Sequence, residues 1–487
     1  MTIKVVLVMY MVVLVILGIL SARRVHSESD YLVAGRGLGT VLLGVTLPAT
    51  QMSAGTAIGT VGYIAFYGYQ YDWFWVALWG GWFISLTLIA PKMWAFGQRN
   101  GSMTMPDVLG ARFGNAMRII SAIVILVCFL LLFSAEYEGA ATVFQLVFGI
   151  SYVPCVLIVA LIVLVYALLG GLFSIARNDL LQMAVFLVGY VAASLYALHA
   201  VGGMTGLQTH LQRINPELLK PLGNKLMPVG TLIGLSLATM VTFIAYPLDS
   251  MKFFSATKKS TLRRAIWIGI LMQVIIGFCI AVIGAAGRVI LPNFSKATMD
   301  DVAPYIALHT MPPVLGALLM AAVLGAVMAV SSSIIMVVSS AFCHDIYPFI
   351  PSVRKRSPMT EKGKLRFERS VSLIVAILGV MIAIRPLGPV STIVTVVQQF
   401  MASTLAVAMI SALNWKRASV SGGIASIIGG FIGVLGWFLM GSPFALSPVY
   451  CGLLFSILGM VVFSLRPAVT PAPSIMEVAI EDTSASL

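Results

Sequence analysis

The residues best placed for chemistry lie inside an apolar stretch. Residues 326–347 read AVMAVSSSIIMVVSSAFCHDIY and carry five serines. Hydroxyl oxygens can help to coordinate a cation that has lost its water, but inside a helix they also bond back to the preceding turn. Ion binding and helix packing are therefore both open for these serines.

Two glutamates form a second candidate group. Glu136 and Glu138 lie in the apolar segment LLFSAEYEGAATV. A charge near the centre of a bilayer costs on the order of 3 kcal/mol on insertion scales, so such acids are functional candidates. Because the two lie roughly 200° apart on a helix, we expect one to face a solute cavity and the other to pair or stay protonated. A purely structural ion pair is the alternative.

The composition identifies the elements that hold these residues. The 487 residues are 60% hydrophobic and 10% charged, and the mean hydropathy is +1.01. Uncharged apolar runs recur from end to end, so an all-α polytopic membrane protein is predicted, with no room for a soluble catalytic domain. The five cysteines and five histidines are scattered, which predicts neither a disulfide framework nor a metal site. We expect no enzyme activity and no cofactor beyond a coupling ion.

Thirteen spans are predicted, and their basic residues indicate an orientation. The spans cover residues 4–22, 41–66, 73–97, 116–147, 152–171, 176–200, 228–250, 264–290, 313–343, 370–386, 390–413, 421–440 and 445–465. With the N-terminus outside and the C-terminus cytoplasmic, the inner segments carry 23 of the 30 Lys and Arg. The net charge of +13 therefore reflects topology, and no nucleic-acid partner is expected.

Two of the spans contain helix breakers. Residues 47–62, LPATQMSAGTAIGTVG, combine Pro48 with three glycines, and residues 228–250 contain Gly230, Gly234 and Pro247. These spans run in opposite directions and lie five spans apart. Interrupted helices at matching positions of two inverted halves are typical of secondary transporters with a site near the membrane midplane.

Several motifs, in order, resemble the solute:sodium symporter family over nearly the whole chain. They are DYLVAGRGLG (30–39), GGLFSIARNDLLQ (170–182), DSMKFFSATKKSTLRRA (249–265) and SSAFCHDIY (339–347). Within that family, residues 197–221 and 285–294 are similar to bacterial pantothenate permeases.

The resemblance implies a LeuT-type fold with a five-plus-five inverted repeat, one extra helix before it and two after it. The expected parts are an N-terminal helix and loop (1–40), the first repeat (41–200), an extracellular loop (201–227), the second repeat (228–414), two accessory helices (415–466) and a disordered cytoplasmic tail (467–487).

The resemblance also implies a sodium site, from which this sequence departs. Three family carbonyl ligands fall on Ala49, Met52 and Ala326, but the two hydroxyl positions hold Ala329 and Val330. Ser333 lies about 40° around the helix from Ala329 and is the nearest substitute. We expect Ser331, Ser332 and Ser339 to bond to their own helix or a neighbour. A shifted sodium site with Ser333, a proton in place of sodium, and a protein without coupling all remain open.

The predicted function is import of a small polar or carboxylate solute by an ion-coupled symporter in a bacterial-type plasma (inner) membrane. Sodium is the first candidate ion. A proton carried by Glu136 or Glu138, an uncoupled facilitator and a transporter-fold sensor are the alternatives. Asp179, at the predicted start of its helix, is expected to cap that helix or complement the charge of its N-terminus and, from the resemblance, to attend ion release. Gln51, Ser53, Thr56 and Gln398 are expected in the solute cavity.

The expected partners are the solute and the lipid bilayer. The chain is expected to be a monomer or, through the GxxxG pattern at 429–433, a weak dimer.

Overall fold

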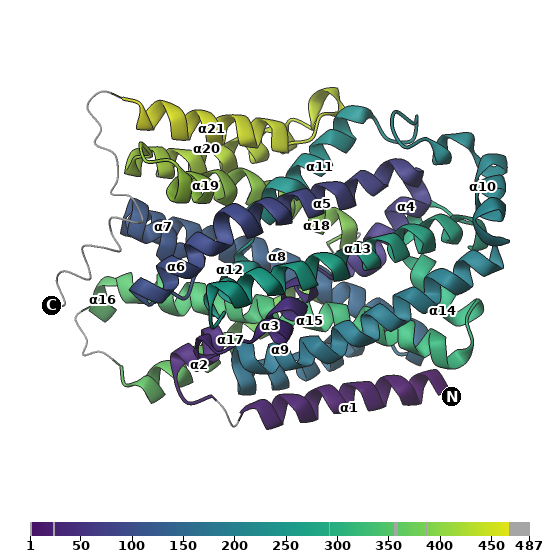
Figure 1. The fold of residues 1–487 in the computed structure, drawn as a ribbon, viewed down its shortest axis with the longest axis horizontal. Helices are drawn as coiled ribbons and strands as arrows, with labels where there is room; N and C mark the ends of the chain where they lie inside the picture. The colour runs from purple at the N-terminus through teal and green to yellow at the C-terminus, as the bar shows by residue number, and fades with distance from the viewer. Residues whose placement is uncertain are drawn as a thin grey trace.

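The structure is a computed structural model that describes residues 2–22, 25–291, 293–354, 359–385, 387–388 and 390–466. It is helical almost throughout, and most helices run along the long axis of the molecule (Figure 1). In these described parts, nine helices are long and apolar enough to cross a membrane, and three shorter apolar helices accompany them. The predicted all-α polytopic class is confirmed. The basic residues Arg23 and Arg24 and the predicted tail (467–487) lie outside the described residues.

Helices coincide with every predicted span. The first half contains α1 (Thr2–Ala22), α3 (Thr40–Ala49), η2 (Gly55–Thr60), α4 (Val61–Tyr67), α5 (Trp73–Ile84), η4 (Ser85–Ile89), α6 (Ala90–Asn100), α8 (Asn115–Phe148) and α9 (Tyr152–Ala200). The second contains α11 (Val229–Ile244), α12 (Pro247–Phe254), α13 (Lys259–Ile290), α15 (Pro313–Asp345), α17 (Glu361–Ala383), α18 (Val390–Met401), η8 (Ala402–Ala406) and α19 (Val407–Asn414). The last pair is α20 (Val420–Leu439) and α21 (Val449–Ser464).

Short helices occupy the connections. They are α2 (Glu28–Val33), η1 (Ala34–Arg36), η3 (Gly68–Asp72), α7 (Met105–Phe113), α10 (Gly203–Ile214), η5 (Pro216–Leu219), η6 (Lys296–Asp301), α14 (Val302–His309), η7 (Tyr347–Phe349), α16 (Pro351–Arg354) and η9 (Pro443–Ala445). Two predicted spans, 152–171 and 176–200, join without a loop in α9. Gly171 turns the chain there with φ of +53°, a conformation that favours glycine.

Both predicted helix breaks are present. The first interrupts the chain between Ala49 and Ala54, directly after Pro48. The second separates α11 from α12 at Ala245 and Tyr246, with Pro247 at the start of the new helix. Proline lacks a backbone N–H, so it ends the hydrogen-bond ladder of one segment and is well tolerated in the first turn of the next.

Two of the sequence motifs meet at one place in the fold. Leu38 and Ala256 form a parallel bridge, in which the Leu38 N–H donates to the Ser255 carbonyl at 3.0 Å. The segment before the first broken span is thereby fixed to the segment after the second.

The GxxxG pattern is used inside the chain. A Cβ at Gly429 would lie 2.7 Å from the Phe455 carbonyl oxygen, and one at Gly433 would lie 2.8 Å from that of Cys451. These glycines therefore let α20 pack closely against α21, which lies beside it (Figure 1).

Candidate functional site

A cavity lies where the two helix breaks face each other. Its lining comes from the first break, η2, η3, α5, α8, α11, the second break and α18, and it encloses about 710 Å³ when its open mouth is included. All four residues expected in a solute cavity line it: Gln51, Ser53, Thr56 and Gln398. None of its described lining residues is Asp, Glu, Lys or Arg. The wall consists of hydroxyl, amide, aromatic and aliphatic groups.

Side chains shape the first break. The Thr56 hydroxyl donates to the Gln51 carbonyl at 2.8 Å, and the Thr56 N–H donates to the Ser53 hydroxyl at 3.2 Å. On the other side of the cavity, the Thr239 hydroxyl donates to Gln398 Oε1 at 3.2 Å. These bonds fix the polar groups that a solute would meet.

Glu136 is buried at this break. Its side chain has no exposed surface, and Oε2 accepts the Ala54 N–H at 2.8 Å. Its Oε1 is buried and has no hydrogen-bond partner among the described residues. Ala54 starts the helix that continues through η2 and α4, so the carboxylate sits on a helix N-terminus, where its charge is favourable.

Glu138 lies elsewhere. It is partly exposed, whereas Glu136 is buried, and neither glutamate is among the residues that line the cavity. The structure thus separates the two glutamates as their 200° offset predicts.

Asp249 was missed as a site residue. It is fully buried in the first turn of α12, and its oxygens accept from the Thr50 hydroxyl at 3.2 Å and from Gln51 Nε2 at 2.9 Å. Trp82 Nε1 donates to the same carboxylate at 3.1 Å. Asp249 therefore connects the two breaks directly. The signal available in the sequence was an acid two residues after Pro247.

Asp179 does not cap a helix, so that expectation was wrong. The second half of α9 begins just after Gly171, which places Asp179 two turns inside the helix. Asp179 is fully buried and forms an ion pair with Lys252 Nζ at 3.5 Å, and the Thr46 hydroxyl also donates to it. Lys252, which follows the predicted span 228–250, is likewise buried.

The serines of α15 divide into two groups. Ser332, Ser339 and Ser340 donate to carbonyls of their own helix at 2.9, 3.1 and 3.0 Å. The buried hydroxyls of Ser331 and Ser333 have no hydrogen-bond partner among the described residues. The expectation for Ser332 and Ser339 holds, whereas that for Ser331 was wrong.

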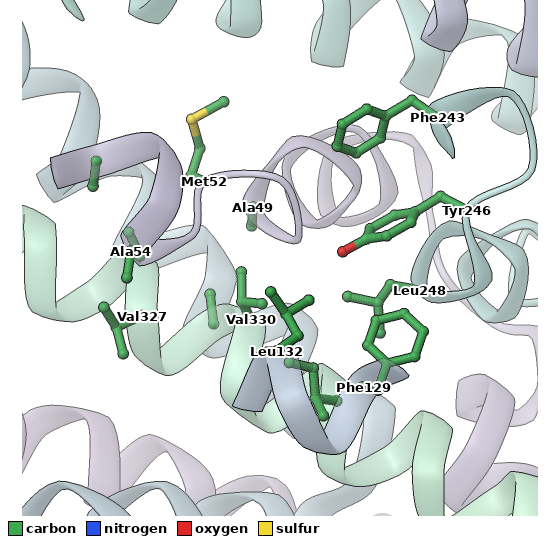
Figure 2. Close-up of a cluster of buried hydrophobic side chains, with 14 of the residues drawn as sticks. Ala49, Met52, Ala54, Phe129, Leu132, Phe243, Tyr246, Leu248, Val327 and Val330 are labelled. Carbon is green, nitrogen blue, oxygen red and sulfur yellow. The ribbon is translucent and has the colours of Figure 1, made fainter. Parts of the chain in front are cut away.

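The expected sodium ligands lie on facing elements. Figure 2 shows Ala49 and Met52 of the first break opposite Val327 and Val330 of α15. The element that carries Ala326 and Ser333 therefore faces the interrupted backbone, and both residues are buried.

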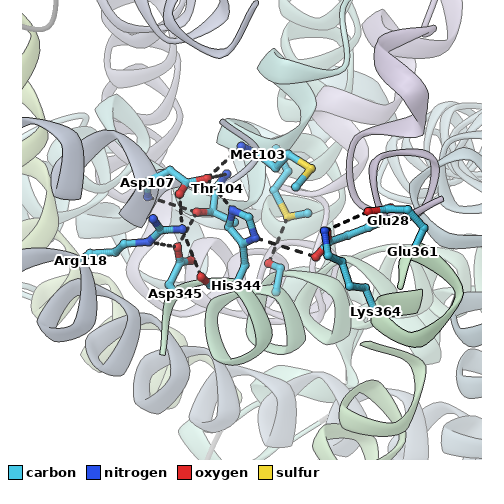
Figure 3. Close-up of polar contacts among 11 residues, drawn as sticks. Glu28, Met103, Thr104, Asp107, Arg118, His344, Asp345, Glu361 and Lys364 are labelled. Carbon is cyan, nitrogen blue, oxygen red and sulfur yellow. Dashed lines mark hydrogen bonds and ion pairs between the residues drawn. The ribbon is translucent and has the colours of Figure 1, made fainter. Parts of the chain in front are cut away.

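A second polar group connects α2, α7, α8, α15 and α17 (Figure 3). We call it the Arg118 network, and it comprises Glu28, Asp107, Arg118, His344, Asp345 and Lys364. Arg118 pairs with Asp107 and with Asp345, the latter at 2.7 Å, and His344 Nε2 lies 3.1 Å from Asp107. Lys364 lies 3.7 Å from Glu28.

Asp107, His344 and Asp345 lie close enough together to hold a metal ion, but Arg118 already pairs with both carboxylates. Burial opposes ionisation of Asp107, yet the hydrogen bond from His344 and the charge of Arg118 prevail and lower its pKa to about 2. The group is thus an ion-pair network, and we do not assign it a metal.

A polytopic bundle with two interrupted helices around a polar cavity defines a secondary transporter. The family model for the sodium:solute symporter family matches residues 31–430. The chain therefore belongs to this family of ion-coupled symporters, which are not enzymes, and the resemblance inferred from the motifs is confirmed.

Two curated relatives match this chain over nearly their whole length. The osmoregulated proline transporter OpuE of Bacillus subtilis is 24% identical, with 94% of each chain covered. The sodium/pantothenate symporter of Escherichia coli is 25% identical over 94% of this chain and 95% of its own. A solved Na+-coupled sialic acid symporter is similar in fold, with a TM-score of 0.82, 18% identity and coverage of 97% and 99%.

Proposed function

We propose that this chain imports a small polar solute through the cavity between its helix breaks, driven by a sodium gradient. The observation that carries the proposal is the cavity itself, which collects Gln51, Ser53, Thr56 and Gln398 from opposite sides of the bundle. The family supports sodium as the coupling ion. The relatives named for proline and pantothenate guide the choice of first solutes.

The sodium site we propose uses the carbonyls of Ala49, Met52 and Ala326 with the hydroxyl of Ser333. Two facts support it: the break faces α15, and the buried Ser333 hydroxyl is unpartnered in the described structure. A buried polar atom without a partner is costly, and a bound ion would remove that cost. Asp179, paired with Lys252, would influence ion release because it also bonds to Thr46, one turn before the break.

We further propose thirteen membrane crossings built from two inverted repeats, 41–200 and 228–414. The segments 1–40, 201–227 and 415–466 are additions to this core. The positions of the two breaks, one in each repeat, support this division. We propose a monomer or weak dimer.

We propose that the N-terminus is outside a bacterial-type plasma membrane and that the end with the Arg118 network is cytoplasmic. α1 begins at one end of the bundle and α21 ends at the other, as an odd number of crossings requires (Figure 1). A cysteine at Thr360 should react with a membrane-impermeant maleimide only after the cells are permeabilised. Labelling in intact cells would reverse the orientation.

A second candidate is proton coupling by Glu136. Both family hydroxyl positions are apolar here, at Ala329 and Val330, while a buried carboxylate lies beside the cavity. Buried carboxylates can exchange protons, so this arrangement suits a proton-driven cycle.

Reconstituted uptake decides between the candidates. Proteoliposomes should accumulate one member of a solute panel when a sodium gradient is imposed at constant pH. Accumulation that follows only a proton gradient would favour Glu136 coupling. Equilibration without accumulation under either gradient would indicate a facilitator, and binding without movement a sensor.

A further inference from the structure

Glu136 occupies a place that an anionic solute would otherwise take. In discontinuous transporter helices, the N-terminus of a half-helix points its partial positive charge at anionic groups of the substrate. Here Glu136 Oε2 accepts the Ala54 N–H at the start of that half-helix. The attraction for an anion is thus already met by a carboxylate of the protein itself.

The carboxylate adjoins the cavity wall from behind, without lining it. Ser53 and Gly55, the neighbours of Ala54 in the chain, line the cavity, and so does Leu132, one helical turn before Glu136. The second oxygen of Glu136 is buried and unpartnered within the described structure. Its negative charge therefore acts on the cavity from behind Ser53 and Gly55.

The buried charge around the cavity is predominantly negative. Asp249 bonds to the lining residues Thr50 and Gln51, and Asp179 lies deeper, beside Lys252. With Glu136, three buried carboxylates thus accompany one buried ammonium group. A low-dielectric cleft surrounded by one sign of charge attracts solutes of the other sign.

The cavity also holds aromatic rings. Tyr71, Phe74, Phe243 and Tyr246 line it, and their faces are favourable for a cationic nitrogen. An anion would find no Lys or Arg among the described lining residues, and burying it unpaired costs several kcal/mol.

We propose that Glu136 determines solute charge: the site selects solutes that present a cationic nitrogen to the first helix break, and it rejects those that present only a carboxylate. This inference rests on the proposed solute cavity and names the class of solute that it takes. A zwitterion fits when its ammonium group faces Glu136.

Two matched probes test it. L-prolinamide carries the cationic nitrogen without a carboxylate, and N-acetyl-L-proline carries the carboxylate without the cation. Their affinities are measured by thermal stabilisation of the purified full chain in saturating sodium. We expect L-prolinamide to bind at least about tenfold more tightly than N-acetyl-L-proline, a difference set by one charge interaction.

Glu136→Gln keeps an acceptor for the Ala54 N–H and removes only the charge. In this variant the preference should fall to within about twofold. Glu138→Gln, on the same helix but away from the cavity, is the matched control and should keep the wild-type preference.

Equal binding of the two probes, binding of neither, or a preference for N-acetyl-L-proline would overturn the inference. Sodium itself should raise the thermal stability of the wild type and of Glu136→Gln equally. If Glu136→Gln lost this stabilisation by sodium, the inference would also be overturned, because Glu136 would then be an ion ligand. Sodium-driven uptake of the solute panel is read separately, so failure of the proposed function is seen independently.

Discussion

Buried carboxylates lie near α15 both in the Arg118 network and, as Glu136, beside the cavity, but only those of the network have cations as partners. In the network, Asp107 and Asp345 share a guanidinium group and Glu28 has an ammonium group 3.7 Å away, although Asp345 Oδ2 has no hydrogen-bond partner among the described residues. Beside the cavity, Glu136 has one backbone N–H and no ion pair among the described residues, and its other oxygen has no hydrogen-bond partner there.

The difference indicates what each region is built for. Paired charges stabilise a structure only while every partner remains, and breaking them is expensive. Unpartnered buried atoms lower stability and persist where a ligand completes them. In the middle of α15, the hydroxyls of Ser331 and Ser333 have no hydrogen-bond partner in the described structure and are therefore available to a ligand. The C-terminal end of α15 is instead held by the ion pair of Asp345 with Arg118.

The largest effect should come from breaking the network. Arg118→Met would leave Asp107 and Asp345 buried without their cation, and the free energy of unfolding should fall by about 3–5 kcal/mol. The measurement is thermal or chemical unfolding of the purified protein. Arg177→Met removes an arginine that stacks on Phe173, outside the network, and should cost under about 1 kcal/mol. Equal losses in both variants would contradict the assignment.

Glu136→Gln should show the opposite pattern. Uptake should fall roughly 10- to 100-fold, because a hydrogen bond to a charged group contributes about 1.5–3 kcal/mol. Stability should change by less than about 1 kcal/mol, since the change removes an incompletely paired buried charge. Glu138→Gln should alter neither property. Normal uptake by both variants at pH 5–8 would remove both glutamates from the mechanism.

The sequence predicts the spans and breaks well because both follow from local chemistry. A membrane requires long apolar helices, and Pro48 and Pro247 mark where two of them break. The first break also brought Gln51 into the predicted cavity, whereas Gln398 was predicted from the family resemblance, and both line the cavity.

Pairings between distant elements could not be predicted in this way. The Asp179–Lys252 ion pair joins residues from different helices, and no local pattern encodes it. Asp249 was missed because its partners Thr50 and Trp82 become neighbours only when the two halves pack together. Ser331 bonds neither to its own helix nor to a neighbouring one, since its hydroxyl has no hydrogen-bond partner in the described structure.

Asp107 should continue to stabilise the Arg118 network down to about pH 4. The pKa of Asp107 lies near 2, below its ordinary value of 3.8, so the carboxylate stabilises the fold above about pH 4 and loses this effect as the pH falls towards 2. At pH 5 the free energy of unfolding of the wild type should exceed that of Asp107→Asn by about 2 kcal/mol, and this difference should shrink as the pH falls below about 4. Unfolding of both proteins across pH 3–8 measures it. A difference that shrinks between pH 8 and 5 would contradict the pairing.

Ser333→Ala should have a smaller effect, on sodium alone. One lost hydroxyl ligand contributes about 1 kcal/mol, so the sodium concentration for half-maximal uptake should rise roughly 3- to 10-fold. Ser339→Ala is the matched control, because that hydroxyl already bonds to the Met336 carbonyl, and it should change the value by less than about twofold. Equal effects of the two variants would show that the α15 serines act in packing.

Added hydroxyl ligands should raise the affinity of the proposed site for sodium. Ala329→Ser with Val330→Thr would place hydroxyls at the two family positions, about one turn from Ser333, and Val330 lies opposite the break (Figure 2). If three carbonyls and Ser333 leave the ion short of ligands, these oxygens should lower the half-maximal sodium concentration by roughly threefold. Sodium-dependent uptake in proteoliposomes measures the change. A lower sodium affinity would mean that Val330 packs where the hydroxyl would stand and that the ion lies further along α15. If wild-type uptake does not depend on a sodium gradient but follows a proton gradient, Glu136 becomes the candidate coupling residue.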